Sequence, residues 1–441
     1  MERRSGHGRG WKAPRVADAR RRLTNIVGGS AGNLVEWFDW YVYSAFALYF
    51  APVFFPKGDT TAQLLNTAAV FAVGFIMRPI GAWVMGMYAD RRGRKAGLTL
   101  SVSLMCLGSL MIACAPTYAS AGLLAPAVLI AARMIQGLSL GGEYGSSATY
   151  LSEMAGKERR GFWSSFQYVT LIAGQLLALA LLLVLQGQLG EAGMERIGWR
   201  IAFGIGAVLA VVVFVIRRNL TETENYQKVA AAGDRPKSSG ANLFRDHPKE
   251  ALLVMALTAG GTLAFYAYTT YMQKYLANTV GFDRAVASRI MTAALFLFML
   301  LQPLGGALSD RIGRRPVMIF FGIAGALTTY PLFVALETTT SPVAAFGLVM
   351  AALVMVTGYT SINAVVKAEL FPAHIRALGV ALPYALANTL FGGTAEYVAL
   401  YLKQIGHERW FYIYVSVVIL GSLIAYVRMR ETKHSSLIND D

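Results

Sequence analysis

Charged residues are scarce in this chain of 441 residues: they make up only 15% of it, whereas 55% is hydrophobic. Soluble globular proteins carry about 25% charged residues, so this chain lacks the polar side chains needed to cover a compact soluble fold. The shortage excludes a soluble enzyme. Because a membrane-spanning helix takes roughly 20 mainly apolar residues, the composition predicts an all-α polytopic membrane protein.

Signals for metal, nucleotide and cofactor chemistry are also lacking. Cys106 and Cys114 share one apolar segment and have neither metal-ligand spacing nor an evident disulfide role. No phosphate-binding loop indicates ATP hydrolysis, and no nucleophile, metal cluster or cofactor motif indicates a membrane enzyme. We therefore expect no metal and no cofactor, with an ion gradient as energy source unless the protein is a passive carrier. All five histidines fall in expected tails, loops or span edges, so a carried proton would reside on carboxylates.

Twelve apolar segments are long enough to span a bilayer, and they form two groups of six. The first group lies at about 25–50, 64–88, 97–116, 122–148, 161–187 and 199–217. The second lies at about 251–276, 286–308, 317–336, 342–366, 377–402 and 410–428. The sequence thus predicts a basic N-tail at 1–24, a six-helix bundle at 25–218, a linker at 219–250, a second six-helix bundle at 251–428 and a C-tail at 429–441.

The basic residues indicate how the chain is oriented. Lys and Arg total 40 against 25 acidic residues. When the two tails and alternate loops are assigned to one side, that side holds 30 of the 40 and the other side 7. Translocation of basic residues is disfavoured, so both termini are predicted to be cytoplasmic. This clustering between apolar segments is typical of membrane orientation, and we expect no nucleic-acid partner.

Two charged motifs occur once in each half. Residues 86–95 (GMYADRRGRK) match residues 306–315 (GALSDRIGRR) about 220 positions later. A glutamate followed by an arginine seven positions on occurs at Glu153 and again at Glu369. Related six-helix halves around a central site are a known transporter plan, so these charges predict a cytoplasmic gate that opens when the halves rock. The predicted gating residues are Asp90, Arg91, Arg94, Glu153, Arg160, Asp310, Arg311, Arg314, Glu369 and Arg376.

On these motifs the chain resembles the major facilitator superfamily. The G-x-x-x-D-R-x-G-R-[KR] loop is similar to that superfamily's signature in both halves, and residues 135–160 resemble its sugar-transporter-type signature. Residues 32–39 (GNLVEWFD) and 78–81 (RPIG) resemble the metabolite:proton symporter family. The resemblance implies twelve transmembrane helices in two six-helix repeats.

Within that family the chain is similar to the branch that transports α-ketoglutarate. The similar segments are 165–171 (SFQYVTL), 270–276 (TYMQKYL) and 392–397 (GGTAEY), and Gln273 stands where relatives for other substrates often have proline. This resemblance implies proton-coupled uptake of a C5 keto-dicarboxylate across the bacterial cytoplasmic membrane, by a chain expected to be monomeric. A symporter for citrate, shikimate or an osmolyte, or a receptor built on a transporter fold, remains an alternative.

Two acids in the first span are candidates for proton coupling. Glu36 and Asp39 fall on roughly one helical face with Asn33 and Tyr43. Membrane depth disfavours the charged form of a carboxyl, which makes it a proton site. The alternative is a structural pair neutralised by a neighbouring arginine.

Substrate recognition requires fixed positive charge, because a dianion in a low-dielectric cavity must be compensated and guanidinium matches carboxylate. Each candidate cation has a structural alternative: Arg78 precedes Pro79 and could fix a kink, Arg200 could serve packing, and Lys274 could extend to the outer interface. The predicted substrate-binding residues are Arg133, Arg78, Arg200, Lys274, Tyr266, Gln167 and Asn33.

Overall fold

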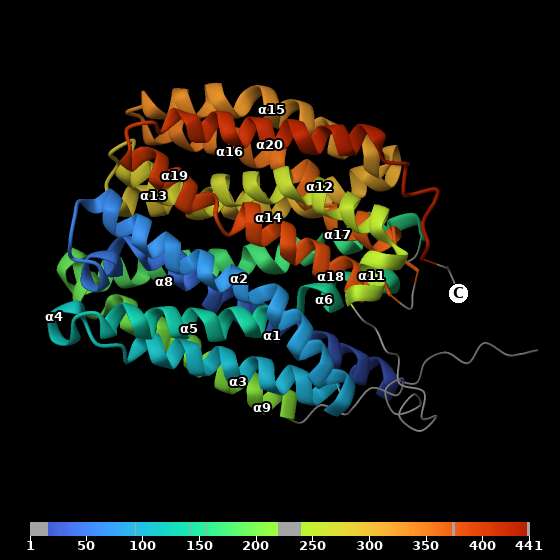
Figure 1. Ribbon diagram of the computed structural model, residues 1–441, viewed down its shortest axis with the longest axis horizontal. Coiled ribbons are helices and arrows are strands. Elements are labelled where there is room, and N and C mark those ends of the chain that lie inside the picture. The colour runs from blue at the N-terminus through green and yellow to red at the C-terminus, as the bar shows by residue number, and fades with distance from the viewer. Residues whose placement is uncertain are drawn as a thin grey trace, which may run out of the picture.

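A computed structural model describes residues 16–92, 94–141, 143–155, 157–218, 240–372 and 375–438. These residues form helices and connecting turns, and none of them is in a β-strand. The helices run side by side along the long axis of the molecule (Figure 1). The expected linker 219–250 lies outside the described residues up to position 239, and its end forms the short helix α11 (Gly240–Asp246) and the start of the next helix.

The first half consists of long helices with two short ones between them. Its bounds are α1 (Val16–Phe54), α2 (Thr60–Arg92), α3 (Arg94–Ala113), α4 (Tyr118–Ala121), α5 (Leu124–Leu140), α6 (Glu143–Met154), α7 (Arg160–Ser164), α8 (Phe166–Gly193) and α9 (Trp199–Arg218).

The second half contains two π-helical turns. Its bounds are α12 (Pro248–Tyr266), a π-helical turn η3 (Ala267–Tyr271), α13 (Met272–Asn278), α14 (Arg284–Ile312), α15 (Arg314–Glu337), α16 (Pro342–Thr360), α17 (Asn363–Glu369), α18 (Arg376–Ala387), a second π turn η4 (Asn388–Gly392), α19 (Ala395–Gln404) and α20 (Arg409–Arg428).

The length and hydropathy of these helices identify them as membrane spans. Eight segments of the described chain are long and apolar enough to cross a bilayer, and one of them runs for 60 residues, from Lys157 to Ile216. At 1.5 Å per residue that segment would extend about 90 Å, whereas the bilayer core is about 30 Å thick. It reverses near Gly190, whose φ of 63° suits glycine, and so supplies two crossings. The eight segments thus supply nine crossings. Helix α1, the α5–α6 pair and the α18–α19 pair supply three more, so the twelve predicted spans are confirmed.

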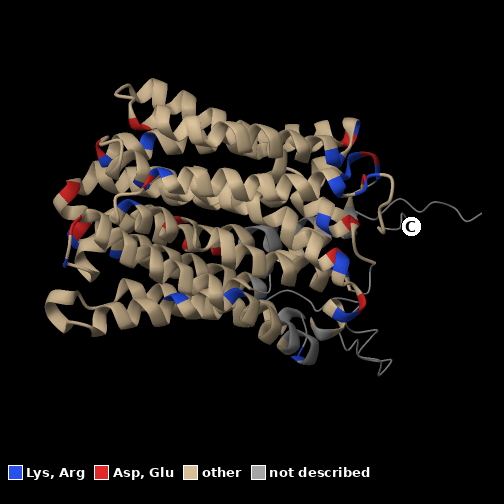
Figure 2. Ribbon diagram, turned by 45° about the horizontal axis from the view of Figure 1, so that its top comes forward, with Lys and Arg blue, Asp and Glu red and all other residues tan. Residues whose placement is uncertain are grey.

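Charged residues gather at the two ends of the helices, and the wide band between them contains few (Figure 2). The two halves meet along α14 against α7 and α8, along α18 against α6, and along α19 against α2. The protein is therefore a multi-pass membrane protein with few charged residues in the central band of its helices.

Candidate functional site

Two arginines of the first half are buried against aromatic rings. Arg78 of α2 places its guanidinium carbon 4.0 Å from the ring centre of Phe75 and 4.2 Å from that of Trp40. Arg133 of α5 lies 3.8 Å from the same Trp40 and 4.4 Å from Tyr43. The indole of Trp40 thus contacts both guanidinium groups, and cation–π attraction stabilises each. In the part of the chain that the structure describes, no carboxylate lies within 4.0 Å of either arginine.

These arginines retain buried donors without acceptors. Among the described residues, Nε and Nη2 of Arg78 and the same atoms of Arg133 have no hydrogen-bond partner, and neither do Gln167 Nε2 and Asn388 Nδ2. Leaving a buried polar group unsatisfied costs about 1–3 kcal/mol. An anion with several acceptor oxygens is the kind of ligand that would satisfy such donors.

Asp39 is linked to Arg133 by hydrogen bonds. Arg133 Nη1 donates to Gln136 Oε1 at 2.8 Å, and Gln136 Nε2 donates to Asp39 Oδ2 at 2.8 Å. Ser109 donates its hydroxyl to the other carboxylate oxygen, and Gly206 of α9 leaves room for it, since a Cβ there would lie 2.3 Å from Asp39 Oδ1. Asp39 therefore faces the interior of the first half, and its charge state acts on Arg133. Glu36 is also buried in α1.

Lys274 of α13 is neutralised in this conformation. Its Nζ donates to Glu396 Oε2 at 2.8 Å, within the second half, and to Ser44 Oγ at 2.6 Å, across the boundary with α1. Gln273 beside it donates to the carbonyl oxygen of Ala45 at 3.3 Å. The adjoining cavity between the halves has a volume of only about 10 Å³, which is room for about one water molecule. The halves are closed together at this level.

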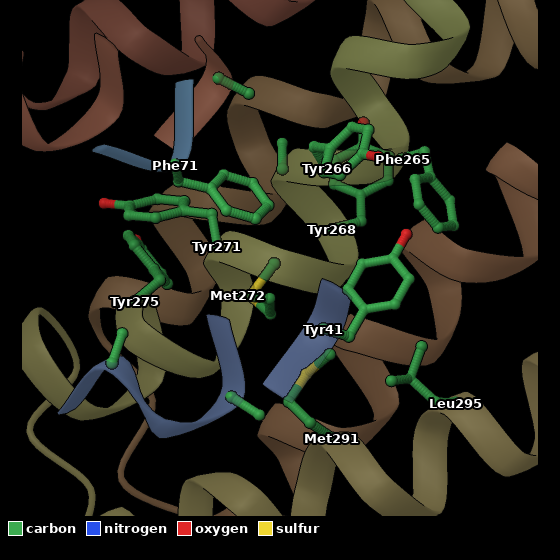
Figure 3. Close-up of a cluster of buried hydrophobic side chains, with 14 of the residues drawn as sticks. Tyr41, Phe71, Phe265, Tyr266, Tyr268, Tyr271, Met272, Tyr275, Met291 and Leu295 are labelled. Atoms are coloured by element: carbon green, nitrogen blue, oxygen red, sulfur yellow. The ribbon is translucent and has the colours of Figure 1, made fainter. Parts of the chain in front are cut away.

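Tyrosine and phenylalanine side chains fill the contact between the halves. Figure 3 shows Tyr41 and Phe71 of the first half lying among aromatic residues of the second half. Tyr266, a predicted binding residue, meets Phe75 edge-on at a ring separation of 5.3 Å. The structure thus brings Arg78, Arg133 and Tyr266 around one aromatic cluster.

The remaining predicted binding residues are placed differently. Gln167 of α8 is buried and accepts a 2.6 Å hydrogen bond from Ser147, and Asn33 is buried in α1. Arg200, in contrast, donates to the carbonyl oxygens of Ala113 and Ala115, at 2.9 and 2.7 Å. Arg200 therefore caps the end of α3, and the structure does not bring it to the arginine and tyrosine cluster.

Lys367 of α17 is a buried basic residue directly after position 366, where the tenth span is expected to end. Its Nζ donates to Asn363 Oδ1 at 2.9 Å and lies 4.0 Å from the ring centre of Tyr384. The expected tenth span ends with the apolar residues Ala364, Val365 and Val366, and Ala368 continues this apolar run past Lys367. That continuity was the signal that could have placed Lys367 in the membrane.

The predicted gating residues of the second half meet those of the first. Arg376 donates to Glu153, and Arg160 lies 3.9 Å from Glu369. The two copies of the Glu-Arg motif thus exchange partners across the halves. Arg314 adds a contact of 3.6 Å to Glu369.

Asp310 binds the start of a helix in the opposite half. Its carboxylate accepts hydrogen bonds at 2.8 Å from the backbone N–H groups of Gly161 and Phe162 in α7, where a helix terminus favours negative charge. Arg314 holds Asp310 at 2.7 Å. Arg311 is exposed at the end of α14 and does not join this network. The side chains of Asp90, Arg91 and Arg94 lie outside the described residues.

Comparison with known proteins gives consistent matches. The family model described as Major Facilitator Superfamily matches residues 30–382 and, separately, 262–439. Alpha-ketoglutarate permease of Escherichia coli (strain K12) is 56% identical over 95% of this chain and 96% of its own length. The citrate-proton symporter of Salmonella typhi is 33% identical over 87% of this chain and 88% of its own length. Among solved structures, a D-xylose-proton symporter has the same fold, with a TM-score of 0.76 at 19% identity, over 95% of this chain and 100% of that chain.

Proposed function

Because the chain belongs to the major facilitator superfamily, we propose that it is a proton-coupled symporter that imports α-ketoglutarate by alternating access. The observation that carries the proposal is the set of buried guanidinium donors without acceptors on Arg78 and Arg133, which fits an anionic ligand. The 56% identity to alpha-ketoglutarate permease over nearly the whole chain supports this dicarboxylate.

Coupling is proposed to run from Asp39 through Gln136 to Arg133. When Asp39 is ionised, its charge compensates that of Arg133 through the bridging amide. When Asp39 takes up a proton, Arg133 keeps its full positive charge for a substrate carboxylate. Each ligand thus strengthens binding of the other, as symport requires. Glu36 is the second acid of the proposed pair.

Closure of the two faces is assigned to different contacts. Two ion pairs between the halves, Arg376 with Glu153 and Arg160 with Glu369, would close the cytoplasmic side. The hydrogen bond from Lys274 to Ser44 would close the outer side. The described ends of the chain and of the linker lie together at one end of the bundle (Figure 1). The excess of basic residues in the tails and linker supports a cytoplasmic position for that end in a bacterial inner membrane.

The test is uptake of labelled α-ketoglutarate into proteoliposomes under an inward proton gradient. Concentrative uptake is expected, and a protonophore should abolish it. The Asp39→Asn variant mimics the protonated acid, so it should exchange labelled for unlabelled substrate without concentrating it. Asp246→Asn, at an exposed position in α11, is the matched control and should concentrate substrate normally.

A citrate symporter is the second candidate, because a relative of that name is 33% identical. Citrate carries one more carboxylate and therefore needs more cationic compensation. Concentrative uptake of citrate with none of α-ketoglutarate would overturn the substrate assignment. Uptake of α-ketoglutarate at the same rate and to the same level with and without the proton gradient would overturn the proposed proton coupling instead.

A further inference from the structure

Lys367 is a buried lysine with no acidic partner among the described residues. It is completely buried in α17, and in the described ranges no carboxylate lies within 4.0 Å of its Nζ. Lys274 provides an internal comparison, since that equally buried lysine is paired with Glu396 at 2.8 Å. A buried charge is normally paired, so the surroundings of Lys367 leave a place for an anion.

The polar contacts of Lys367 are neutral and include one from the opposite half. Nζ lies 3.3 Å from the hydroxyl oxygen of Tyr144 in α6 and 2.9 Å from the amide oxygen of Asn363. Tyr144 stacks on Tyr384 of α18 with ring centres 3.7 Å apart. Lys367 therefore lies at the contact between the two halves, two residues before Glu369 of the cytoplasmic network.

Aromatic side chains of α12 and α18 lie between Lys367 and the arginine cluster. The Lys367 ammonium lies 4.0 Å from the ring centre of Tyr384 in α18. Arg78 lies 4.0 Å from the ring centre of Phe75, which meets Tyr266 of α12 edge-on at 5.3 Å, and α12 packs against α18. Two basic side chains, one from each half and neither paired with a described carboxylate, thus contact one group of aromatic residues.

We propose that Lys367 binds the distal carboxylate of the substrate, while Arg78 holds the end that bears the keto group. This assignment rests on the proposed transport of a keto-dicarboxylate. A guanidinium presents a planar fork that matches a carboxylate and its neighbouring oxygen, whereas an ammonium is a compact point charge suited to a single carboxylate. A dicarboxylate held at both ends would draw the two halves together, whereas a monocarboxylate would contact the basic residue of only one half.

The test compares two ligands that differ only at the distal end, α-ketoglutarate and 2-oxopentanoate, which has a methyl group there. Affinities are measured from the ligand-dependent rise in melting temperature of the purified protein. The variants are Lys367→Gln, Lys367→Met and Lys367→Arg, with Lys249→Gln at an exposed position as control. Lys367→Met keeps an apolar side chain of similar length, so that a folded neutral variant is available.

The neutral variants should bind α-ketoglutarate at least about tenfold more weakly, as loss of a charged hydrogen bond predicts, and 2-oxopentanoate with nearly unchanged affinity. Lys367→Arg should retain the preference for the dicarboxylate, and Lys249→Gln should match the parent protein. A neutral variant that keeps the parent's ratio of the two affinities would overturn the assignment of Lys367. A parent protein that binds neither acid would instead overturn the proposed function on which the assignment depends.

Discussion

At the scale of single residues, glycines set how closely α2 approaches α5. The spacing of Gly137, Gly141 and Gly145 predicts close helix contact, and the structure places each against a neighbouring helix. A Cβ on Gly137 would lie 2.1 Å from the carbonyl oxygen of Gly74, and one on Gly141 would lie 2.2 Å from that of Arg78. Because Gly137 and Gly141 have no side chains, the backbone of α2 that carries Arg78 can lie directly against α5 and its C-terminal end.

We expect Gly137→Ala to destabilise the protein by about 1–3 kcal/mol, because the added methyl group forces α2 and α5 apart. Gly421→Ala in α20 is the matched control, since nothing lies within 4 Å of the added Cβ there. Thermal unfolding in detergent, followed by tryptophan fluorescence, measures both variants. Equal melting temperatures for the two would show that α2 can move without cost.

Sequence reasoning identified the buried residues whose chemistry is unusual in a membrane, but not their partners. Arg78, Arg133 and Asp39 stand out because ionisable groups at membrane depth are rare. Their shared contacts, the indole of Trp40 and the amide of Gln136, depend on how the helices pack and have no local signal. Lys367 falls just outside the expected span 342–366 because hydropathy alone gives inexact span edges.

At the scale of elements, the spans were predictable and their interruptions were not. Apolar length identifies a crossing, but it does not distinguish a continuous helix from one with a π turn such as η3 or η4. Both π turns lie in spans that line the contact between the halves. Polar residues line these turns, and Asn388 of η4 accepts a hydrogen bond from Thr262 of α12.

The C-terminal segment 429–438 crosses the ion-pair network of Glu153, Arg160, Glu369 and Arg376 and contacts both halves. Glu431 accepts hydrogen bonds at 2.9 Å from the backbone N–H groups of Arg314 and Arg315 at the start of α15. Leu437 accepts one at 2.8 Å from Arg376, and Ser436 accepts one at 3.2 Å from Arg160 of the first half. This segment therefore helps to hold the network closed.

Removing residues 431–441 should open the cytoplasmic side more often, because Arg376 and the start of α15 lose these partners. Ser164 of α7 is buried beside the network, so a Ser164→Cys probe, with Cys106 and Cys114 replaced by serine, reports opening through its alkylation rate. We expect faster alkylation than in the full chain. Removal of 439–441 alone is the control and should leave the rate unchanged. Unchanged alkylation after the longer truncation would mean that the segment contributes nothing to closure.

At the scale of the whole molecule, the two halves are joined by ion pairs of the equivalent residues Glu153 and Glu369, which are not equally buried. The Glu153 side chain is 42% exposed, whereas that of Glu369 is 1% exposed. Exposed ion pairs contribute about 0–1 kcal/mol, whereas removing one partner of a buried pair costs about 3–5 kcal/mol because the other charge remains buried. The internal repeat was visible in the sequence, whereas the burial of Glu369 depends on its contacts with Arg314 and with Thr432 of the C-terminal segment.

Glu369→Gln should therefore open the cytoplasmic side far more than Glu153→Gln, although both remove one carboxylate of the same repeated motif. Without the Glu369 carboxylate, the buried guanidinium groups of Arg160 and Arg314 lose the acid that both contact across the halves, while Arg314 keeps Asp310. With the Ser164→Cys probe, we expect Glu369→Gln to raise the alkylation rate at least about tenfold and Glu153→Gln about twofold or less. Each variant serves as the matched control for the other, provided that both unfold cooperatively on heating. Equal rates in the two variants would show that burial does not decide which copy of the motif holds the halves together.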